Sequence, residues 1–404
     1  MASYIKSMTG AVPALDKLLT SFNIWKAPAM VLPQVKSLHE CVDYAKVVEP
    51  FIPHFYELPY KIWANIDSLE GLRSVYVTTN PLISGFAIAL VFGLLTLIAS
   101  EINRNYSQVD RLWSILPNLF VVHIAVWARL AGLPHDRVDL IAVYTTIWSI
   151  RLTYNYWRRG GYNIGSEDYR WMVVKAKLNS IVWFIFNVTF ISFFQCILLY
   201  LFSCVPAYVI LLSSQLEPGV QLVDLVFFGA EILLVLSEWI SDGQQWAYQT
   251  AKYKYKDTGE LTRGYTPAEL ERGFVAKGLW AYSRHPNFFA EQSIWFILYS
   301  WSCFAANTPY SWAGTGAVLL VLLFQGSTNL TEKITAGKYP EYEAYQKHVG
   351  MFIPKTLAPY RTPTTRVLRS SDLVKRAEQK QAEKQAEKQA EKQAEKQRTK
   401  KKQG

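Results

Sequence analysis

Cysteine is scarce in this 404-residue chain, and its spacing argues against two kinds of site. The four cysteines show none of the CxxC spacing that is typical of zinc ligands, and three of them lie in apolar segments. The sequence therefore indicates neither a metal site nor a disulfide framework. The four residues are Cys41, Cys196, Cys204 and Cys303.

The chain also lacks the short motifs of several enzyme classes. It contains no zinc-binding helix motif, no nucleophile elbow, no Walker loop and no GxGxxG segment. Residues 1–30 lack an uninterrupted apolar stretch after a basic start, so we expect no cleavable signal peptide. Any chemistry of this chain has to be sought in other groupings of polar residues.

Positive charge is abundant, with a formal net charge of +10, but its distribution argues against nucleic acid as a partner. The basic residues cluster in particular loops and in the C-terminal tail, as orientation determinants of membrane proteins do. Half of all residues are apolar, and 14 are tryptophan. We therefore expect the partner to be a lipid bilayer.

Long apolar segments indicate an all-α fold, a polytopic membrane bundle of about seven helices. A span needs roughly 20 mostly apolar residues, because a helix rises about 1.5 Å per residue through a hydrocarbon core about 30 Å thick. The predicted spans are 81–100, 112–131, 139–157, 178–214, 220–240, 287–305 and 312–330.

The segment 178–214 is longer than one ordinary span. It is either one long tilted helix, with a kink near Pro206, or two spans that meet there. Loop charge favours one span, because splitting the segment places the two richest basic loops, 158–177 and 241–286, on opposite faces of the membrane. We therefore predict seven spans, with the N-terminus outside and the C-terminus in the cytosol.

The two ends of the chain differ from the membrane domain that we predict for residues 80–355. Residues 1–79 are predicted to form short amphipathic helices broken by prolines. Residues 356–404 form a charged tail in which QAEK is repeated four times, and we expect a solvated extension there. The predicted breaks are at Pro28, Pro33, Pro50, Pro53 and Pro59.

Polar groups at membrane depth are energetically expensive and mark function by default. The first such cluster places Arg151, Asn155 and Arg158 on one helix face, at i, i+4 and i+7, followed by Arg159 and Arg170. Arginine suits phosphate groups because its guanidinium offers paired donors. The alternative for Arg158 and Arg159 is membrane orientation by long side chains that reach the interface.

The second cluster places Glu238, Asp242 and Gln245 at i, i+4 and i+7 across the end of the fifth span. Its alternative interpretation is a polar helix terminus anchored by tryptophan. We favour a functional role, because two acids lie beside basic loops that need partners.

The third cluster lies at the start of the sixth span, and the fourth cluster follows the seventh span. The third is Arg284, His285, Asn287 and Glu291, where a proline after the histidine suits the first position of a helix. The fourth comprises Glu332 and a tyrosine-rich segment that includes Tyr345. For the fourth cluster, a plain membrane-surface anchor is an equally good interpretation.

These clusters, in this order, resemble the steroid 5-alpha-reductase C-terminal-domain superfamily. The most similar part of it is an uncharacterised branch, domain of unknown function 1295. The resemblance covers about residues 80–355. It is carried by Val109-Asp-Arg-Leu-Trp-Ser114, Arg158-Arg-Gly-Gly-Tyr162, Glu167-Asp-Tyr-Arg-Trp171, Asp242-Gly-Gln-Gln-Trp246, Gly278-Leu-Trp-Ala-Tyr-Ser-Arg-His-Pro-Asn287 and Lys338-Tyr-Pro-Glu-Tyr-Glu-Ala-Tyr345.

The resemblance implies a cytosol-facing cavity that holds NADPH, and a lipid substrate that enters from the bilayer. Hydride then goes to the beta carbon of a conjugated double bond, while an acid or a tyrosine polarises the carbonyl. In this chain Asp110 and Tyr154 are the candidates for that acid and that tyrosine. The implied cofactor-binding residues are Arg151, Asn155, Arg158, Arg159, Arg170, Asp242, Gln245, Arg284, His285, Asn287, Glu291, Glu332 and Tyr345.

Two other functions remain open at this point. Isoprenylcysteine and phospholipid methyltransferases share the Arg-His-Pro-Asn signature but use S-adenosylmethionine. The five basic residues between positions 158 and 177 favour a dinucleotide with three phosphates over that cofactor. A non-enzymatic lipid-binding protein on the same scaffold would need no cofactor.

The C-terminus suggests a location. Lys401 and Lys402 stand fourth and third from the end, which resembles the dilysine retrieval signal of endoplasmic reticulum membrane proteins. Recognition by a cytosolic coat protein requires an accessible carboxyl terminus. We therefore expect a multi-pass protein of the endoplasmic reticulum membrane with a cytosolic C-terminus.

Overall fold

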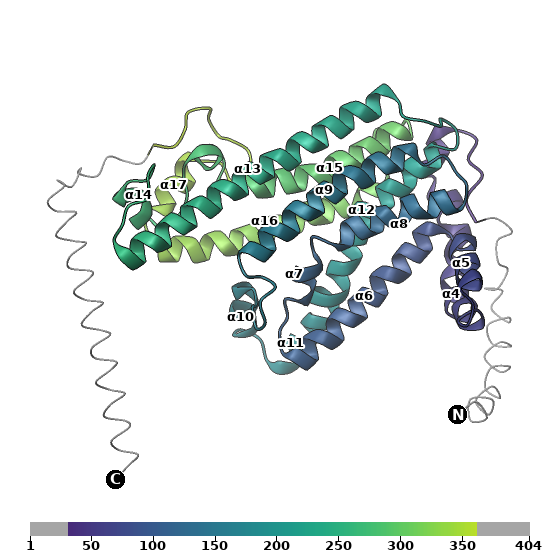
Figure 1. The fold of residues 1–404 in the computed structure, drawn as a ribbon, viewed down its shortest axis with the longest axis horizontal. Coiled ribbons are helices and arrows are strands. Elements are labelled where there is room, and N and C mark those ends of the chain that lie inside the picture. Colours follow the sequence, from purple (N-terminus) through teal and green to yellow (C-terminus); the bar gives the residue numbers. More distant parts are fainter. Residues whose placement is uncertain (1–30, 362–404) are drawn as a thin grey trace, which may run out of the picture. The chain divides into compact units, whose positions relative to one another are not determined.

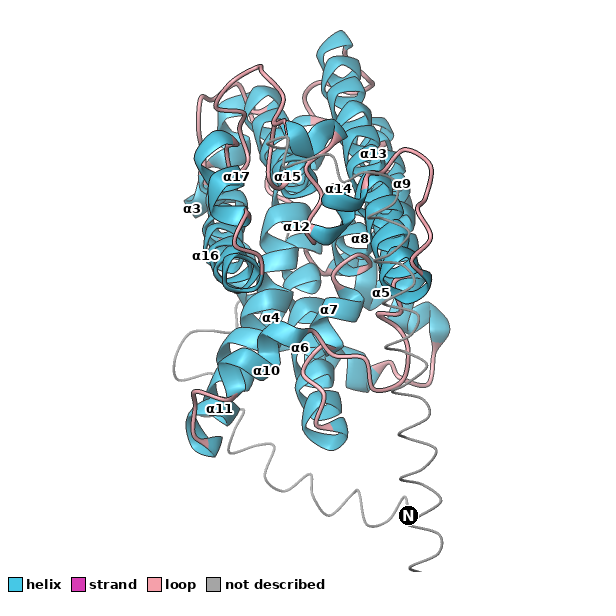
Figure 2. Ribbon diagram, turned by 90° about the vertical axis from the view of Figure 1, so that its left-hand side faces the viewer, coloured by secondary structure: helices cyan, strands magenta, loops and turns pink. Residues whose placement is uncertain are grey.

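Helices make up the regular secondary structure of this protein. The structure is a computed structural model that describes residues 31–361, and within that range every regular element is a helix (Figures 1 and 2). Only an isolated bridge between Ser283 and Gly350 departs from this pattern among these residues. The predicted fold class, an all-α membrane bundle, is confirmed.

The described residues form two compact units that are not simple successive stretches of sequence. Unit one comprises residues 31–235 and 291–326, and unit two comprises residues 236–290 and 327–361. Helices α13, α15 and α16 contribute residues to both units. Each unit is described by itself below.

Unit one contains most of the apolar helices. Short helical turns occupy Leu38–Val42, Tyr44–Val47 and Glu49–Phe51 before the first long helix. The helices that follow are α4 (Ile52–Ala64), α5 (Leu69–Thr78), α6 (Pro81–Asn103), α7 (Gln108–Leu112), α8 (Leu116–Leu130), α9 (Asp136–Arg158), α10 (Tyr169–Lys175), α11 (Ser180–Phe186), α12 (Gln195–Ser213), the first parts of α13 (Leu222–Thr258) and α16 (Thr315–Lys338), and most of α15 (Pro286–Ala305).

One continuous helical segment, Ser180–Ser213, forms the centre of unit one. It consists of α11, a π-helical segment at Asn187–Phe194 and α12, which packs against α6, α8 and α9 (Figure 1). Pro206 lies inside α12 without ending it. The preferred single helix is therefore confirmed, and the alternative of two spans meeting at Pro206 is wrong. Apolar side chains surround α12 on all sides, and such a helix is stable only when buried.

Within residues 31–361, three helical segments are long and apolar enough to cross a membrane: Pro81–Asn103, Ser180–Ser213 and Trp312–Lys338. The 34 residues of the second extend about 50 Å, which exceeds the hydrocarbon core and requires a tilt. Helix α8 is apolar but shorter. The remaining predicted spans coincide with α9, α13 and α15 (Pro286–Ala305), which carry polar residues in their interior-facing positions.

Unit two is built around aromatic residues. The last part of α13 packs through Tyr248 and Ala251 against a cluster that includes Leu270 of α14 (Pro267–Glu271) and Trp280. Residues 241–258, predicted as the start of a basic loop, are instead a continuation of α13, and the prediction of a loop is wrong there. Burial of Tyr248 and Ala251 stabilises the helix beyond the end of the apolar stretch.

The segment before the first span contains real helices, but one predicted break is wrong. Helix α4 begins next to Pro53, at a position that tolerates proline, and continues through Pro59 to Ala64. Pro59 lies on the exposed side of the helix. Pro28, the QAEK repeats and the C-terminal lysines lie outside the described residues.

Candidate functional site

A row of polar side chains runs along one face of α9 in the interior of unit one. Tyr144, Trp148 and Arg151 follow at intervals of four and three residues, which places them one above the other on the helix. All three are buried. We call these residues, with their partners Glu231, Glu291 and Trp295, the interior polar row.

Glu291 is the acceptor at one end of this row. Its Oε2 accepts a hydrogen bond of 2.9 Å from the indole Nε1 of Trp148, and its Oε1 accepts one of 3.0 Å from Trp295. A guanidinium nitrogen of Arg151 lies 3.8 Å from Oε2. The structure thus brings together two residues, Arg151 and Glu291, that the sequence assigned to different clusters.

Tyr144 and Glu231 form the other end of the row. Both are fully buried, and the phenol and the carboxyl interact with each other. Among the described residues, neither the phenol oxygen nor either carboxyl oxygen has a hydrogen bond of normal geometry. A buried carboxyl in this situation is costly, so the pair is a functional candidate by default.

The pair of Tyr144 and Glu231 was not predicted from the sequence, although a signal was present. Tyr144 lies seven residues before Arg151, and Glu231 lies seven residues before Glu238, so each shares a helix face with a residue already singled out. The packing of α9 against α13 was needed to connect them.

The cytosol-side end of α9, in our predicted topology, carries two further arginines. Arg158 donates to Asn155 Oδ1 at 2.9 Å and lies over the Tyr154 ring, while Arg159 lies over the ring of Tyr156. Helix α9 ends at Arg158, and Gly160 follows with a φ of +82°, a left-handed conformation that favours glycine. The two guanidinium groups are held by neighbouring rings and remain at least partly exposed.

The two residues proposed as the catalytic pair have different environments. Asp110, on α7, accepts a hydrogen bond of 2.9 Å from Trp171 Nε1. Burial raises the pKa of Asp110 above the ordinary value. Tyr154 is 47% exposed and packs against Trp157 and Arg158. Asp110 and Tyr154 therefore have separate partners, unlike Tyr144 and Glu231.

Arg170 is engaged with a neighbouring acid. Its Nε and Nη2 donate to the two carboxylate oxygens of Asp168, each at 2.8 Å. Burial opposes ionisation of Asp168, but the bonds from Arg170 outweigh it and lower the pKa of that carboxyl. This pair of hydrogen bonds orders the loop before α10. It also occupies the two guanidinium donors with which Arg170 would otherwise bind a phosphate.

In unit two, four side chains converge on the predicted carboxylate Glu332, and two of them, Arg284 and His285, were themselves predicted site residues. Arg284 donates to both of its oxygens, at 2.6 and 2.9 Å, and His285 Nε2 lies 2.9 Å from Oε1. Tyr342 and Gln346 of α17 (Tyr342–His348) also donate to it. We call this group the Glu332 cluster. The members of the cluster satisfy one another's hydrogen bonds and charges. This indicates a structural role, in which the cluster holds α16, α17 and the start of α15 together.

The other predicted residues of unit two make contacts outside the Glu332 cluster. Asn287 Nδ2 donates to Asp242 Oδ1 at 3.1 Å, so these two predicted residues are brought together. The Tyr345 hydroxyl donates to the Trp280 carbonyl, and burial raises the pKa of Tyr345. Gln245 Oε1 is buried without a hydrogen-bond partner among the described residues.

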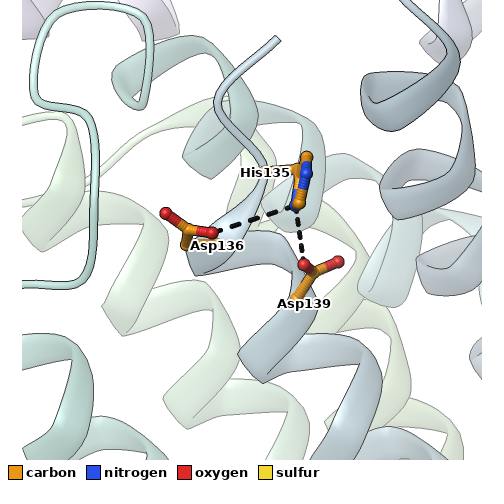
Figure 3. A group of neighbouring side chains, drawn as sticks. All are labelled: His135, Asp136 and Asp139. Carbon is orange, nitrogen blue, oxygen red and sulfur yellow. Dashed lines mark hydrogen bonds and ion pairs between the residues drawn. The ribbon is translucent and has the colours of Figure 1, made fainter. Parts of the chain in front are cut away.

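A further polar group lies at the start of α9 (Figure 3). His135, Asp136 and Asp139 lie near one another, with His135 Nδ1 at 2.7 Å from Asp139 Oδ2. Arg129 pairs with the same carboxylate at 2.6 Å, and the group is largely open to solvent. Acidic side chains are favourable at a helix N-terminus, which explains Asp136 and Asp139 in the first turn of α9. The ion pair with Arg129 explains the position of the Asp139 carboxylate.

Comparison with known proteins identifies relatives for this chain. A family model described as "Protein of unknown function (DUF1295)" matches residues 96–349. An uncharacterised protein of Schizosaccharomyces pombe is 34% identical over 329 residues, which cover 81% of this chain and 94% of that protein. No solved structure matches the chain.

Proposed function

This chain belongs to the DUF1295 family, and we propose that it is an integral membrane oxidoreductase that uses NADPH to reduce the conjugated carbon–carbon double bond of a lipid enone. The substrate class comprises steroids, sterols and other apolar enones. The proposal concerns the interior polar row of unit one, where buried polar groups are concentrated.

The observation that carries the proposal is the Tyr144–Glu231 pair. Reduction of an enone places negative charge on the carbonyl oxygen, and a hydrogen-bond donor aimed at that oxygen lowers the barrier. Two O–H groups, the phenol of Tyr144 and the acid form of Glu231, lack normal hydrogen-bond partners within the described residues. A substrate carbonyl placed beside this pair could therefore accept a hydrogen bond from the Tyr144 hydroxyl in place of its contact with Glu231.

Residues along α9 fit a phosphate-bearing dinucleotide. Arg158 and Arg159 would hold phosphate groups, because their guanidinium groups are partly exposed and held in place by rings. Arg151, with Trp148 and Glu291, would contact the other end of the cofactor. When bound, NADPH would supply the hydride for the reduction. Arg170 would add little, since its donor fork is occupied by Asp168.

The protein's own residues then have three tasks. Tyr144 donates a hydrogen bond to the substrate carbonyl and stabilises the developing enolate. Glu231 would hold the phenol in position and, in its acid form, would give the alpha carbon of the enolate the proton that completes the addition of two hydrogens. Glu231 would recover that proton from solvent after the product leaves. The apolar surroundings of unit one exclude water, which strengthens each polar contact.

The location is part of the proposal. Exposed apolar side chains along α6, including Val91, Leu94, Leu95 and Ile98, are suited to contact with lipid. We propose that the protein resides in the endoplasmic reticulum membrane with its C-terminus in the cytosol, where Lys401 and Lys402 would be read by a coat protein. Replacement of Lys401 and Lys402 by serine should release the protein from that membrane.

Cofactor binding and turnover test the proposal. Calorimetry on the full-length protein in nanodiscs should detect NADPH, with an affinity on the order of micromolar to millimolar, as for typical enzyme substrates. The same protein should then consume NADPH in the presence of progesterone or a long-chain enoyl ester. Binding of S-adenosylmethionine without NADPH would instead favour a lipid methyltransferase. Binding of lipid with neither cofactor would favour a non-enzymatic protein.

A further inference from the structure

Helix α4 has its polar and apolar faces reversed relative to a helix that faces water. Ile52, Tyr56, Tyr60 and Trp63 follow one another along a single face, at intervals of four, four and three residues, and this face is exposed, with Trp63 69% exposed. The polar residues His54 and Glu57 are buried. An exposed aromatic face with buried polar groups requires a partner that is not water.

The buried polar face is fixed by specific contacts. His54 Nδ1 accepts a hydrogen bond of 2.9 Å from the backbone nitrogen of Asn80, and Lys61 pairs with Glu57 at 2.6 Å. The bond between His54 and Asn80 defines which side of α4 faces the rest of unit one, whereas the Lys61–Glu57 pair lies within the helix. The aromatic side is therefore turned outward by the packing of the helix.

The hairpin of α4 and α5 is attached to the ends of two apolar helices. Only Thr79 and Asn80 separate α5 from α6, the most apolar of the candidate spans. The Tyr76 hydroxyl bonds to His123 Nδ1 at 2.8 Å, and Trp127 Nε1 donates to the carbonyls of Tyr76 and Thr79. His123 and Trp127 belong to α8, which places the hairpin at the end of α8 and the start of α6.

One ring contact indicates the depth of the hairpin. Phe55 of α4 packs against Phe86 of α6, with ring centroids 5.7 Å apart. Phe86 lies five residues into α6, about 7 to 8 Å along the helix axis. Interfacial helices immerse their apolar face about 5–10 Å into the boundary between headgroups and acyl chains.

From this arrangement we propose that the exposed face of α4, formed by Ile52, Tyr56, Tyr60 and Trp63, is a membrane-interface anchor whose partner is the lipid of the bilayer at the end where α6 begins. Tyrosine and tryptophan suit this position because their rings are apolar and their polar atoms reach the wet headgroups. A second protein, or residues 1–30 of the same chain, are the competing occupants.

Site-directed spin labelling tests the proposal on the full-length protein. The native cysteines Cys41, Cys196, Cys204 and Cys303 are buried, so an introduced cysteine can be labelled selectively. Labels at Tyr56→Cys and Trp63→Cys are compared with a label at Arg73→Cys, which lies on an exposed part of α5. The protein is reconstituted in phosphatidylcholine vesicles, and relaxation by oxygen, which partitions into lipid, is compared with relaxation by a water-soluble nickel chelate.

The ratio of oxygen to nickel accessibility should be several-fold higher at positions 56 and 63 than at position 73. Equal ratios at all three positions would show that the face is exposed to water and would overturn the proposal. Exclusion of both reagents from positions 56 and 63 would show that protein covers the face, and would also overturn it. Melting temperatures close to that of the unlabelled protein identify variants with an intact fold.

Discussion

Arg137 and Asp224 form an ion pair in which guanidinium and carboxylate are 3.0 Å apart and both side chains are almost completely shielded from solvent. The guanidinium also donates to Ser213, and the same carboxylate accepts from Trp301 Nε1. Each of the four residues belongs to a different helix: Arg137 to α9, Ser213 to α12, Asp224 to α13 and Trp301 to α15. The ion pair therefore ties together four helices of unit one.

Removal of the charge on Asp224 should destabilise the protein strongly. We expect Asp224→Asn to cost about 3–5 kcal/mol, because it leaves the buried Arg137 without a counterion. Asp139→Asn is the matched control, since its pair with Arg129 is exposed to solvent and contributes little to stability. Thermal and denaturant unfolding in detergent measure both variants. If both variants lost a similar amount of unfolding free energy, burial would not be what makes the Arg137–Asp224 pair important for stability.

Glu291 should contribute to cofactor affinity. Glu291→Gln keeps the shape of the side chain but removes the charge beside Arg151, and we expect NADPH binding to weaken by about 1–3 kcal/mol, roughly fivefold to more than a hundredfold. Glu101→Gln is the control, because Glu101 pairs with the exposed Arg104. Calorimetric titration of both proteins provides the measurement. Unchanged affinity in the Glu291→Gln protein would remove Glu291 from the cofactor site.

Tyr144 should affect turnover more than binding. Tyr144→Phe removes one hydroxyl and is expected to lower kcat by about 10²- to 10⁴-fold, the usual contribution of a positioned proton donor. The Kd for NADPH should change little. Tyr154→Phe is the informative comparison, because Asp110 and Tyr154 are the pair that the sequence suggested. A large loss of kcat in the Tyr154→Phe protein alone would return the catalytic role to that pair.

The Glu332 cluster should act on stability rather than on the cofactor. Glu332→Gln leaves Arg284 buried beside a neutral amide, and we expect a loss of about 3–5 kcal/mol. Glu341→Gln, a change in the exposed segment before α17, should have little effect. Unfolding measurements and NADPH titration are made on each protein. A Glu332→Gln protein that unfolds normally but loses NADPH binding would show that the cluster belongs to the cofactor site.

Lys252 provides a prediction about pH. Burial, with smaller contributions from Lys338 and Lys256, lowers the pKa of Lys252 from 10.5 to about 8. The charged form is thus disfavoured in the folded protein, and the penalty is fully present below about pH 8 and disappears as the pH rises toward 10.5. Lys252→Met should therefore gain stability relative to the native protein at pH 7, and this gain should shrink with rising pH.

The control for this measurement is Lys254→Met. Lys254 is exposed and pairs with Glu260 at 2.9 Å. Because Lys254 is exposed, its substitution should change the pH dependence of the unfolding free energy less than Lys252→Met does. If the change in unfolding free energy caused by Lys252→Met did not vary with pH more strongly than that caused by Lys254→Met, Lys252 would titrate alike in the folded and unfolded states.

Much of the fold was accessible from the sequence because apolar length and loop charge are local properties. The all-helical class and the single helix at 178–214 were predicted from composition, apolar length and charge. The prediction of a break at Pro59 was wrong, since proline can remain on the exposed side of a helix that tertiary contacts hold in place. The start of the basic loop at position 241 was wrong for a similar reason, because packing of Tyr248 extends α13.

The sequence by itself determined which residues are polar in an apolar environment, and these are the residues from which any site must be built. Only the tertiary structure decided their partners. It joined Arg151 to Glu291 and Tyr144 to Glu231, and it used Arg284 and His285 to hold Glu332. The physical reason is that helical periodicity specifies which residues share a face, whereas the pairing of faces depends on how helices distant in sequence pack against each other.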